Sequence, residues 1–202
     1  MKNGSPNRFS EQCENVILAD ADHVDKVVFN LIVNFERMLG RRIPQADLAR
    51  WIDCVALDGG LRPGNNITRV VLIHDERTVK LDNFTPSDLI GELDGKAFKD
   101  DIGEFIICSC TAEGFVSKEE FFEDALLTIV NQANVKRVMV IPDEETTYNG
   151  VRRALRQVPD DKKVTVFTMQ PMPGGSFRQE ILGYSLMSAL GIRGEEISGG
   201  ER

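Results

Sequence analysis

The stretch of sequence that decides the fold is Val16-Ile17-Leu18-Ala19-Asp20-Ala21-Asp22-His23. Its apolar run has no polar alternation, which is typical of a strand that helices cover on both faces. Residues 24–39 follow with apolar side chains at helical spacing, and Gly40 marks the end of that helix. A fully buried strand followed directly by an amphipathic helix indicates a layered α/β fold.

The same alternation of apolar strands and amphipathic helices continues along the chain. Further strands are expected at residues 67–74, 105–108, 138–141 and 163–168. Further helices are expected after Pro44, over 117–132 and 147–157, and between Ser176 and Leu190. Residues 75–102 are polar and irregular, with a short helix expected near Thr85. The pattern predicts one α/β domain over 15–190, with a mostly parallel central sheet, helices on both faces and flexible tails at 1–14 and 191–202.

The composition limits the classes of function. Hydrophobic residues make up 42% and charged residues 28% of the 202 residues, which are values of an ordinary globular protein. The 24 basic and 32 acidic residues give a formal net charge of −8, which disfavours tight, indiscriminate binding to a phosphate backbone. No apolar run approaches the roughly 18 residues that cross a bilayer, and the amino terminus does not resemble a secretory signal. We therefore expect a cytoplasmic protein without a membrane partner.

Acidic residues stand directly after three of the predicted strands. They are Asp20 and Asp22 after the first strand, Asp75 and Glu76 after the second, and Asp143, Glu144 and Glu145 after the fourth. The carboxyl ends of parallel strands meet at one edge of the sheet, where ligands bind in such folds. Carboxylates that gather there repel one another unless a cation is present, and Mg²⁺ is held by carboxylates, water and substrate phosphates. The pattern fits metal-dependent hydrolysis of a phosphodiester.

Each of these acids also has a structural explanation. Acidic side chains cap helices and favour the positive amino-terminal end of the helix dipole. Asp22 would then cap the first helix, and Glu144 and Glu145 would lie in the first turn of the helix that follows the fourth strand. Both explanations stay open on the sequence alone.

Residues 16–23 resemble the opening of NYN domains, which belong to the PIN-like ribonuclease superfamily. In that family an apolar strand delivers a metal-binding Asp, followed by a small residue, Asp and Asn. Residues 124–167 are similar to the family's second half, in which a helix with an inward acid leads to a strand ending in Ser-Gly-Asp-x-Asp. Here Asp124 precedes Asp143 by 19 residues, and Asp143 and Glu145 stand where the two acids of the motif would be.

The resemblance implies a PIN/NYN-like three-layer architecture and cleavage of single-stranded RNA. It implies that Asp20, Asp124 and Asp143 are catalytic ligands of Mg²⁺ or Mn²⁺, with Asp22 and Glu145 as further metal ligands. Three differences from the motif, Ile141-Pro142 for Ser-Gly, Glu145 for Asp and His23 for Asn, favour a second hypothesis. A divergent bacterial branch would keep the fold as a non-enzymatic interaction module, with a protein partner at residues 75–102 or as a homo-oligomer.

Two features further along the chain offer ligand contacts. Arg152, Arg153 and Arg156 follow the acids and could hold backbone phosphates beside a metal, or they could pair with surface carboxylates. Met172-Pro173-Gly174-Gly175-Ser176 precedes a predicted helix and could form a phosphate-binding turn, or a plain loop with a serine cap. The turn supports a third hypothesis, an α/β domain that binds a nucleotide or another small molecule.

Overall fold

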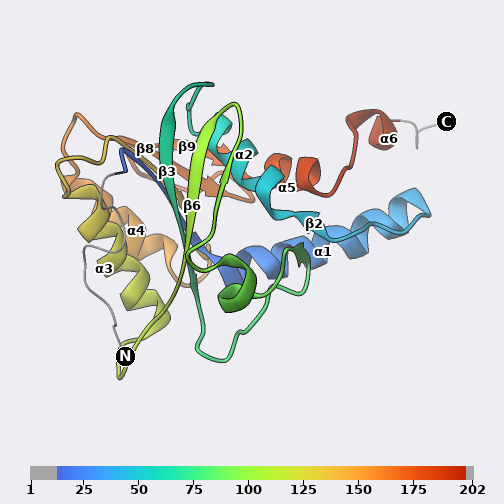
Figure 1. The fold of residues 1–202 in the computed structure, drawn as a ribbon, viewed down its shortest axis with the longest axis horizontal. Coiled ribbons are helices and arrows are strands. Elements are labelled where there is room, and N and C mark those ends of the chain that lie inside the picture. The colour runs from blue at the N-terminus through green and yellow to red at the C-terminus, as the bar shows by residue number, and fades with distance from the viewer. Residues whose placement is uncertain (1–12, 199–202) are drawn as a thin grey trace.

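The computed structural model describes residues 13–198, so residues 1–12 and 199–202 of the two predicted tails lie outside the described part (Figure 1). At the amino end of the described chain, Cys13 is fully buried. At the carboxyl end, Gly194–Ser198 forms a short helix, α6. No helix among the described residues is both long enough and apolar enough to cross a membrane.

A seven-stranded sheet forms the middle layer of the molecule. Its strands run in the order β5-β6-β3-β1-β7-β8-β9, and every neighbouring pair is parallel except β5 and β6. The strands are β1 Asn15–Asp20, β3 Asn66–His74, β5 Ala97–Lys99, β6 Gly103–Thr111, β7 Arg137–Ile141, β8 Lys163–Thr168 and β9 Arg178–Ile181. The short strands β2 Ala46–Asp47 and β4 Phe84–Thr85 pair separately. The prediction of a mostly parallel central sheet is confirmed.

Helices cover both faces of the sheet, as Figure 1 shows. One face carries α1 Ala21–Leu39, α2 Leu48–Asp58 and α5 Leu182–Ala189, and the other carries α3 Lys118–Val130 and α4 Tyr148–Ala154. The alternation within β1 explains this, because Ile17 and Ala19 join the core on the first face while Val16 and Leu18 join the core on the second. The three-layer α/β class follows from a central strand that is apolar on both sides.

The ends of the helices are fixed by particular side chains. Asp20 caps α1 by accepting a hydrogen bond of 3.0 Å from the backbone N–H of His23, and Gly40 ends the helix with a left-handed φ of 63°. The cap is therefore Asp20 and not Asp22. The capping box expected at the start of α3 is present, since Ser117 and Glu120 each bind the other's backbone N–H.

Three segments differ from their prediction. Residues 75–102 contain β4, the π-helix Leu89–Leu93 (η2) and β5, and they bury five apolar side chains, Leu81, Phe84, Leu89, Leu93 and Ile102. The helix expected over 147–157 ends at Ala154 and continues as a 3₁₀ turn, Leu155–Gln157 (η3), ahead of Pro159. The helix expected from Ser176 begins only at Leu182, because residues 178–181 pair with β8 as a strand.

The order of the strands places a topological switch point in the middle of the sheet. From β1 the chain moves outward to β3 and β6, and it then returns to β7 on the other side of β1. Ligands in open α/β sheets bind outside the carboxyl ends of the strands at such a point. The fold therefore directs attention to the residues that follow β1 and β7.

Candidate functional site

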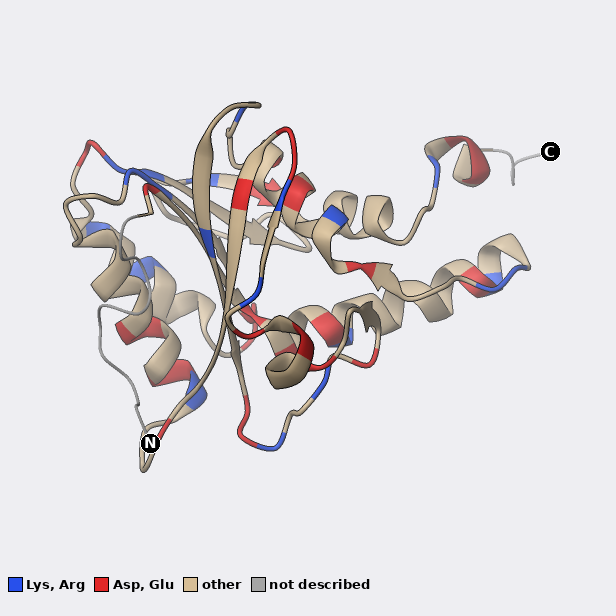
Figure 2. Cartoon of the chain, viewed as in Figure 1, with Lys and Arg blue, Asp and Glu red and all other residues tan. Residues whose placement is uncertain are grey.

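The ammonium group of Lys118 lies among three carboxylates at the carboxyl edge of the sheet. Its Nζ is 3.2 Å from Oδ1 of Asp20, 3.1 Å from Oδ2 of Asp22 and 3.6 Å from Oδ2 of Asp75. Asp20 ends β1, Asp22 lies in the first turn of α1, Asp75 follows β3, and Lys118 is the first residue of α3. We call these four residues the Lys118 cluster. Figure 2 shows acidic segments in the loops at this edge, close to the start of α3.

Lys118 is the residue that the sequence reasoning missed. A signal was present, because a cation in the first turn opposes the helix dipole and so requires another stabilising partner. Its side chain is only 14% exposed. Burial lowers the pKa of the Lys118 ammonium, but the charges of Asp20 and Asp22 outweigh that effect and hold its pKa above the usual value.

Asp22 is the best-satisfied carboxylate of the Lys118 cluster. Its Oδ1 accepts a hydrogen bond of 2.6 Å from the Thr78 hydroxyl, and its Oδ2 accepts one of 2.8 Å from the backbone N–H of Asp75. Burial raises the pKa of the Asp22 carboxyl, but these hydrogen bonds and Lys118 outweigh it and hold the pKa below its usual value. The first helix and the loop after β3 are therefore joined through an ionised Asp22.

Asp20 differs from Asp22 because it is almost completely buried. Its side chain is 1% exposed, and burial raises the pKa of its carboxyl although the N–H of His23 and the charge of Lys118 act in the opposite direction. Its Oδ1 serves both His23 and Lys118, whereas its Oδ2 is buried with no hydrogen-bond partner among the described residues. Asp20 therefore has one acceptor atom left for a proton or a cation.

Asp143, which follows β7, lies beside His23, and this histidine separates it from Asp20. Its Oδ2 is 3.7 Å from Nδ1 of His23, and its Oδ1 accepts hydrogen bonds of 2.9 Å from the N–H of Glu145 and 3.3 Å from that of Thr146. Nε2 of His23 is buried and has no partner among the described residues. The structure thus brings Asp20 and Asp143 to the switch point, while Asp143 also fixes the turn that leads to α4.

The other two predicted metal ligands, Asp124 and Glu145, are exposed and lie outside the Lys118 cluster. Asp124 is exposed on α3, where it lines a hollow with Val116, Glu120 and Glu123. Glu145 is exposed, and its side chain makes no hydrogen bond or ion pair among residues 13–198. The structure therefore gathers Asp20, Asp22 and Asp143 near one another. Glu145 contacts Asp143 only through its backbone N–H, and Asp124 lies away on the exposed side of α3.

The three arginines predicted to hold phosphates, Arg152, Arg153 and Arg156, lie in three different environments. Arg153 forms an ion pair of 3.1 Å with Glu123 of α3, as the surface-pairing alternative proposes. The guanidinium of Arg152 packs so closely against Gly174 that a Cβ there would lie 2.5 Å from it. Arg156 is exposed in the η3 turn, so it does not share one continuous α-helix with Arg152.

The arrangement of the carboxylate oxygens at this edge indicates whether the predicted Mg²⁺ or Mn²⁺ could bind there. Asp20, Asp22 and Asp75 supply carboxylate oxygens of the kind that a hard cation prefers, but Lys118 lies between them. Across residues 13–198, no three His, Cys, Asp or Glu side chains are grouped so that they could hold a metal ion. These oxygens would hold a metal only if the lysine moved away.

A hollow of about 600 Å³ opens beside the Lys118 cluster. Asp75, Thr78 and Lys118 line it together with His74 and Val116. His74 is buried and bonds through Nε2 to the Ser109 hydroxyl at 2.6 Å, so it is a structural side chain of this wall. A ligand or partner that enters this hollow meets the Lys118 cluster.

Comparison of the chain with curated proteins and with solved structures gave no match. One family model matches residues 10–197, which is nearly the whole chain. Its span includes all the strands of the sheet, the Lys118 cluster and Asp143. The chain therefore belongs to the family of unknown function DUF6621.

Proposed function

We propose that this chain is a NYN/PIN-like α/β protein in which Lys118 takes the position of a metal ion, and that it acts as an interaction module. One observation carries the proposal: the ammonium lies within 3.6 Å of three carboxylates, two from the junction of β1 with α1 and one from the loop after β3. The positions of Asp20 and Asp143 at the ends of β1 and β7 support the likeness to that superfamily.

The geometry of the Lys118 cluster favours an ammonium over a divalent ion. Mg²⁺ needs oxygen ligands at about 2.0–2.1 Å, whereas the three nearest carboxylate oxygens surround Nζ at 3.1–3.6 Å. Both oxygens of Asp22 are already held, by Thr78 and by the backbone of Asp75. A metal would have to displace a positive charge and also draw these fixed carboxylates inward.

The partner expected at this edge is a protein with a basic and partly apolar surface. Val79 and Phe115, each next in sequence to a residue that lines the hollow, are exposed to 66% and 108%. The exposed carboxylates Asp75 and Glu76 stand in the same loop as Val79, with one exposed arginine, Arg77, so residues 75–79 of the rim offer an apolar side chain and an excess of negative charge. Burial of exposed apolar side chains with complementary charge is the usual chemistry of a specific interface.

A cleavage assay and a capture assay test this function together. With Mn²⁺ and single-stranded RNA, the wild type should leave the RNA intact. Phe115→Asp, at the rim of the hollow, should no longer capture a partner that the wild type captures. Ile67→Asp is the control, because Ile67 is exposed at the opposite edge of the sheet, and this variant should still capture the partner. Mn²⁺-dependent cleavage that disappears in Asp20→Asn would contradict the proposal.

Metal-dependent hydrolysis of RNA is the second candidate, and one observation favours it. The buried Oδ2 of Asp20 has no partner among the described residues, which leaves an acceptor at the switch point. In this candidate Lys118 would move toward a substrate phosphate, and Asp20, Asp22 and Asp143 would hold Mg²⁺ or Mn²⁺, which would supply an activated water. The same cleavage assay decides between the two candidates.

A further inference from the structure

Three basic residues share one face of the sheet at its amino edge, opposite the edge that carries the Lys118 cluster. Arg137 of β7 is in register with Lys163 of β8, and Thr165 of β8 is in register with Arg178 of β9. Neighbours in register on parallel strands point to the same side, and so do residues two apart on one strand. The pairing therefore brings Arg137, Lys163 and Arg178 around Thr165.

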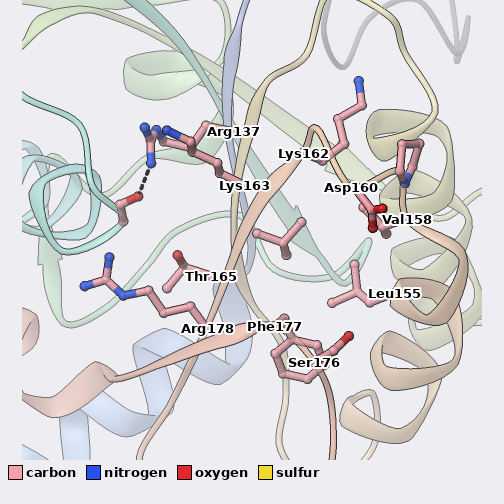
Figure 3. A pocket seen from close by; sticks show the side chains of 13 residues that line it. Arg137, Leu155, Val158, Asp160, Lys162, Lys163, Thr165, Ser176, Phe177 and Arg178 are labelled. Carbon is pink, nitrogen blue, oxygen red and sulfur yellow. Dashed lines mark hydrogen bonds between the residues drawn. The ribbon is translucent and has the colours of Figure 1, made fainter.

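A cavity of about 410 Å³ opens at this edge and includes these three cations in its wall, together with Lys162, whose Nζ donates hydrogen bonds to the carbonyls of Gln132 and Val135. Figure 3 shows Arg137, Arg178 and Thr165 on one side of β8, and Leu155, Ser176 and Phe177 on the other side. The cavity thus has a cationic side, and its other side combines apolar side chains with Lys162 and Asp160. Its size falls within the range of small-molecule sites, which are about 300–1,000 Å³.

The cations have fewer partners than their charge requires. Nη1 of Arg137 donates a hydrogen bond of 2.7 Å to the carbonyl of Gly59, a neutral acceptor. Burial lowers the pKa of the Arg137 guanidinium, and the nearby charges of Arg62 and Arg178 lower it further. Within residues 13–198 the Nζ of Lys163 forms no ion pair or hydrogen bond. An acidic chain has therefore collected like charges at one place.

The acidic groups nearby balance only part of this charge. Nε and Nη2 of Arg178 bind Oε1 of Glu180 at 2.9 and 2.5 Å. Asp160 lies on the other side of β8, across the cavity from the arginines (Figure 3). The carboxylate of Asp58 also lies near Arg178 and Glu180. Two carboxylates for Arg137, Lys163 and Arg178 leave a positive charge for an anionic group, whose oxygens the Lys163 ammonium and the remaining N–H groups of the arginines can bind.

We propose that this cavity binds a small organic phosphate monoester of the nucleoside monophosphate kind. The phosphate lies against Arg137, Lys163 and Arg178, and the hydroxyl of Thr165 is available to it on the same face. The organic part lies across the end of β8 against Leu155 and Phe177. The predicted phosphate-binding turn contributes Ser176 to the wall, although β9 follows it instead of a helix.

Calorimetric titration of the full chain tests this site with three probes: adenosine 5′-monophosphate, adenosine and inorganic phosphate. The nucleotide should bind saturably, inorganic phosphate at least tenfold more weakly, and adenosine without measurable heat. Lys163→Gln and Arg178→Gln should each weaken nucleotide binding about tenfold, because each removes a charge-assisted contact. Lys99 is exposed on β5 at the other end of the sheet, so Lys99→Gln should leave nucleotide binding unchanged. Thermal melts establish that each variant is folded.

Several results would overturn the proposal. They are an absence of nucleotide binding, equal binding of adenosine, equal binding of inorganic phosphate, and unchanged binding by folded Lys163→Gln and Arg178→Gln. Tighter binding of a 5′-hydroxyl oligoribonucleotide that depends on Lys163 would assign the cations to an RNA backbone instead. None of these results depends on the Lys118 cluster, which lies at the opposite edge.

Discussion

The side chains of Asp20 and Lys118 meet at 3.2 Å although 98 residues separate them in the chain. The contact joins the end of the central strand β1 to the first residue of α3, a helix on one face of the sheet. Asp20 is buried and caps α1 at the same time. One lysine therefore neutralises a carboxylate that the fold itself needs in its centre.

Replacement of Lys118 by Met should destabilise the protein by about 2–4 kcal/mol at pH 7, because removal of one partner leaves a buried carboxylate without its counter-charge. The loss should shrink toward pH 4, because Asp20, whose pKa burial raises, takes up a proton as the pH falls. Urea unfolding at both pH values measures the free energy. Lys26→Met, an exposed change on α1, should alter it by less than about 0.5 kcal/mol. An equally small effect of Lys118→Met would contradict the described contacts.

Replacement of Thr78 by Val should move the pKa of Asp22 back toward its usual value, because the 2.6 Å hydrogen bond to Asp22 is lost. A carboxyl with a lowered pKa in the folded state contributes stability that is present above the unfolded pKa of about 3.9 and is lost as the pH falls through the folded pKa. The variant should be about 1 kcal/mol less stable at pH 7 and equal to the wild type near pH 2. NMR titration of the Asp22 carboxyl and unfolding curves check both statements.

Replacement of Asp53 by Asn should stabilise the protein at neutral and higher pH. Burial and the neighbouring Asp100 raise the pKa of Asp53 to about 7, with Asp47 adding to the effect, and Oδ1 of Asp53 is buried without a partner among the described residues. The folded state therefore holds a proton that the unfolded state has lost, so wild-type stability falls as the pH rises from about 4 to 7.

Asp53→Asn removes that penalty, and we expect a gain of about 1 kcal/mol at pH 8 with little change at pH 4, since the partly solvated carboxyl is screened. Thermal melts at the two pH values provide the measurement, with Asp101→Asn, an exposed change in the loop before β6, as the matched control. A variant that is less stable than the wild type at pH 8 would show that Asp53 is not held near Asp100 as described.

The layered fold could be predicted because its cause is local. The run at 16–19 is apolar on both faces, and β1 lies in the middle of the sheet with a helical layer on each side. The strand β9 could not be predicted, because residues 178–181 form a strand only through pairing with β8. Pairing between distant segments leaves no periodic signal in a polar stretch.

The candidate site also has a part that could be predicted from the sequence and a part that could not. Asp20 and Asp143 lie on either side of His23 because two strands end at one switch point, which the alternating pattern indicates. Lys118 stands outside any recognisable spacing, and it joins the cluster only through the packing of α3 against the sheet. The exposure of Asp124 does follow from the sequence, because Phe122, Ala125 and Ile129 define the buried stripe of α3 and Asp124 lies away from it.

We propose that Lys118 occupies, among Asp20, Asp22 and Asp75, the position of a metal cation. The most direct test is calorimetric titration of Mn²⁺ into the wild type, Asp20→Asn, Lys118→Met, and Lys118→Met combined with Asp20→Asn. We predict no saturable binding to the wild type, binding to Lys118→Met, and loss of that binding in the double variant. Saturable Mn²⁺ binding to the wild type that disappears in Asp20→Asn would contradict the claim.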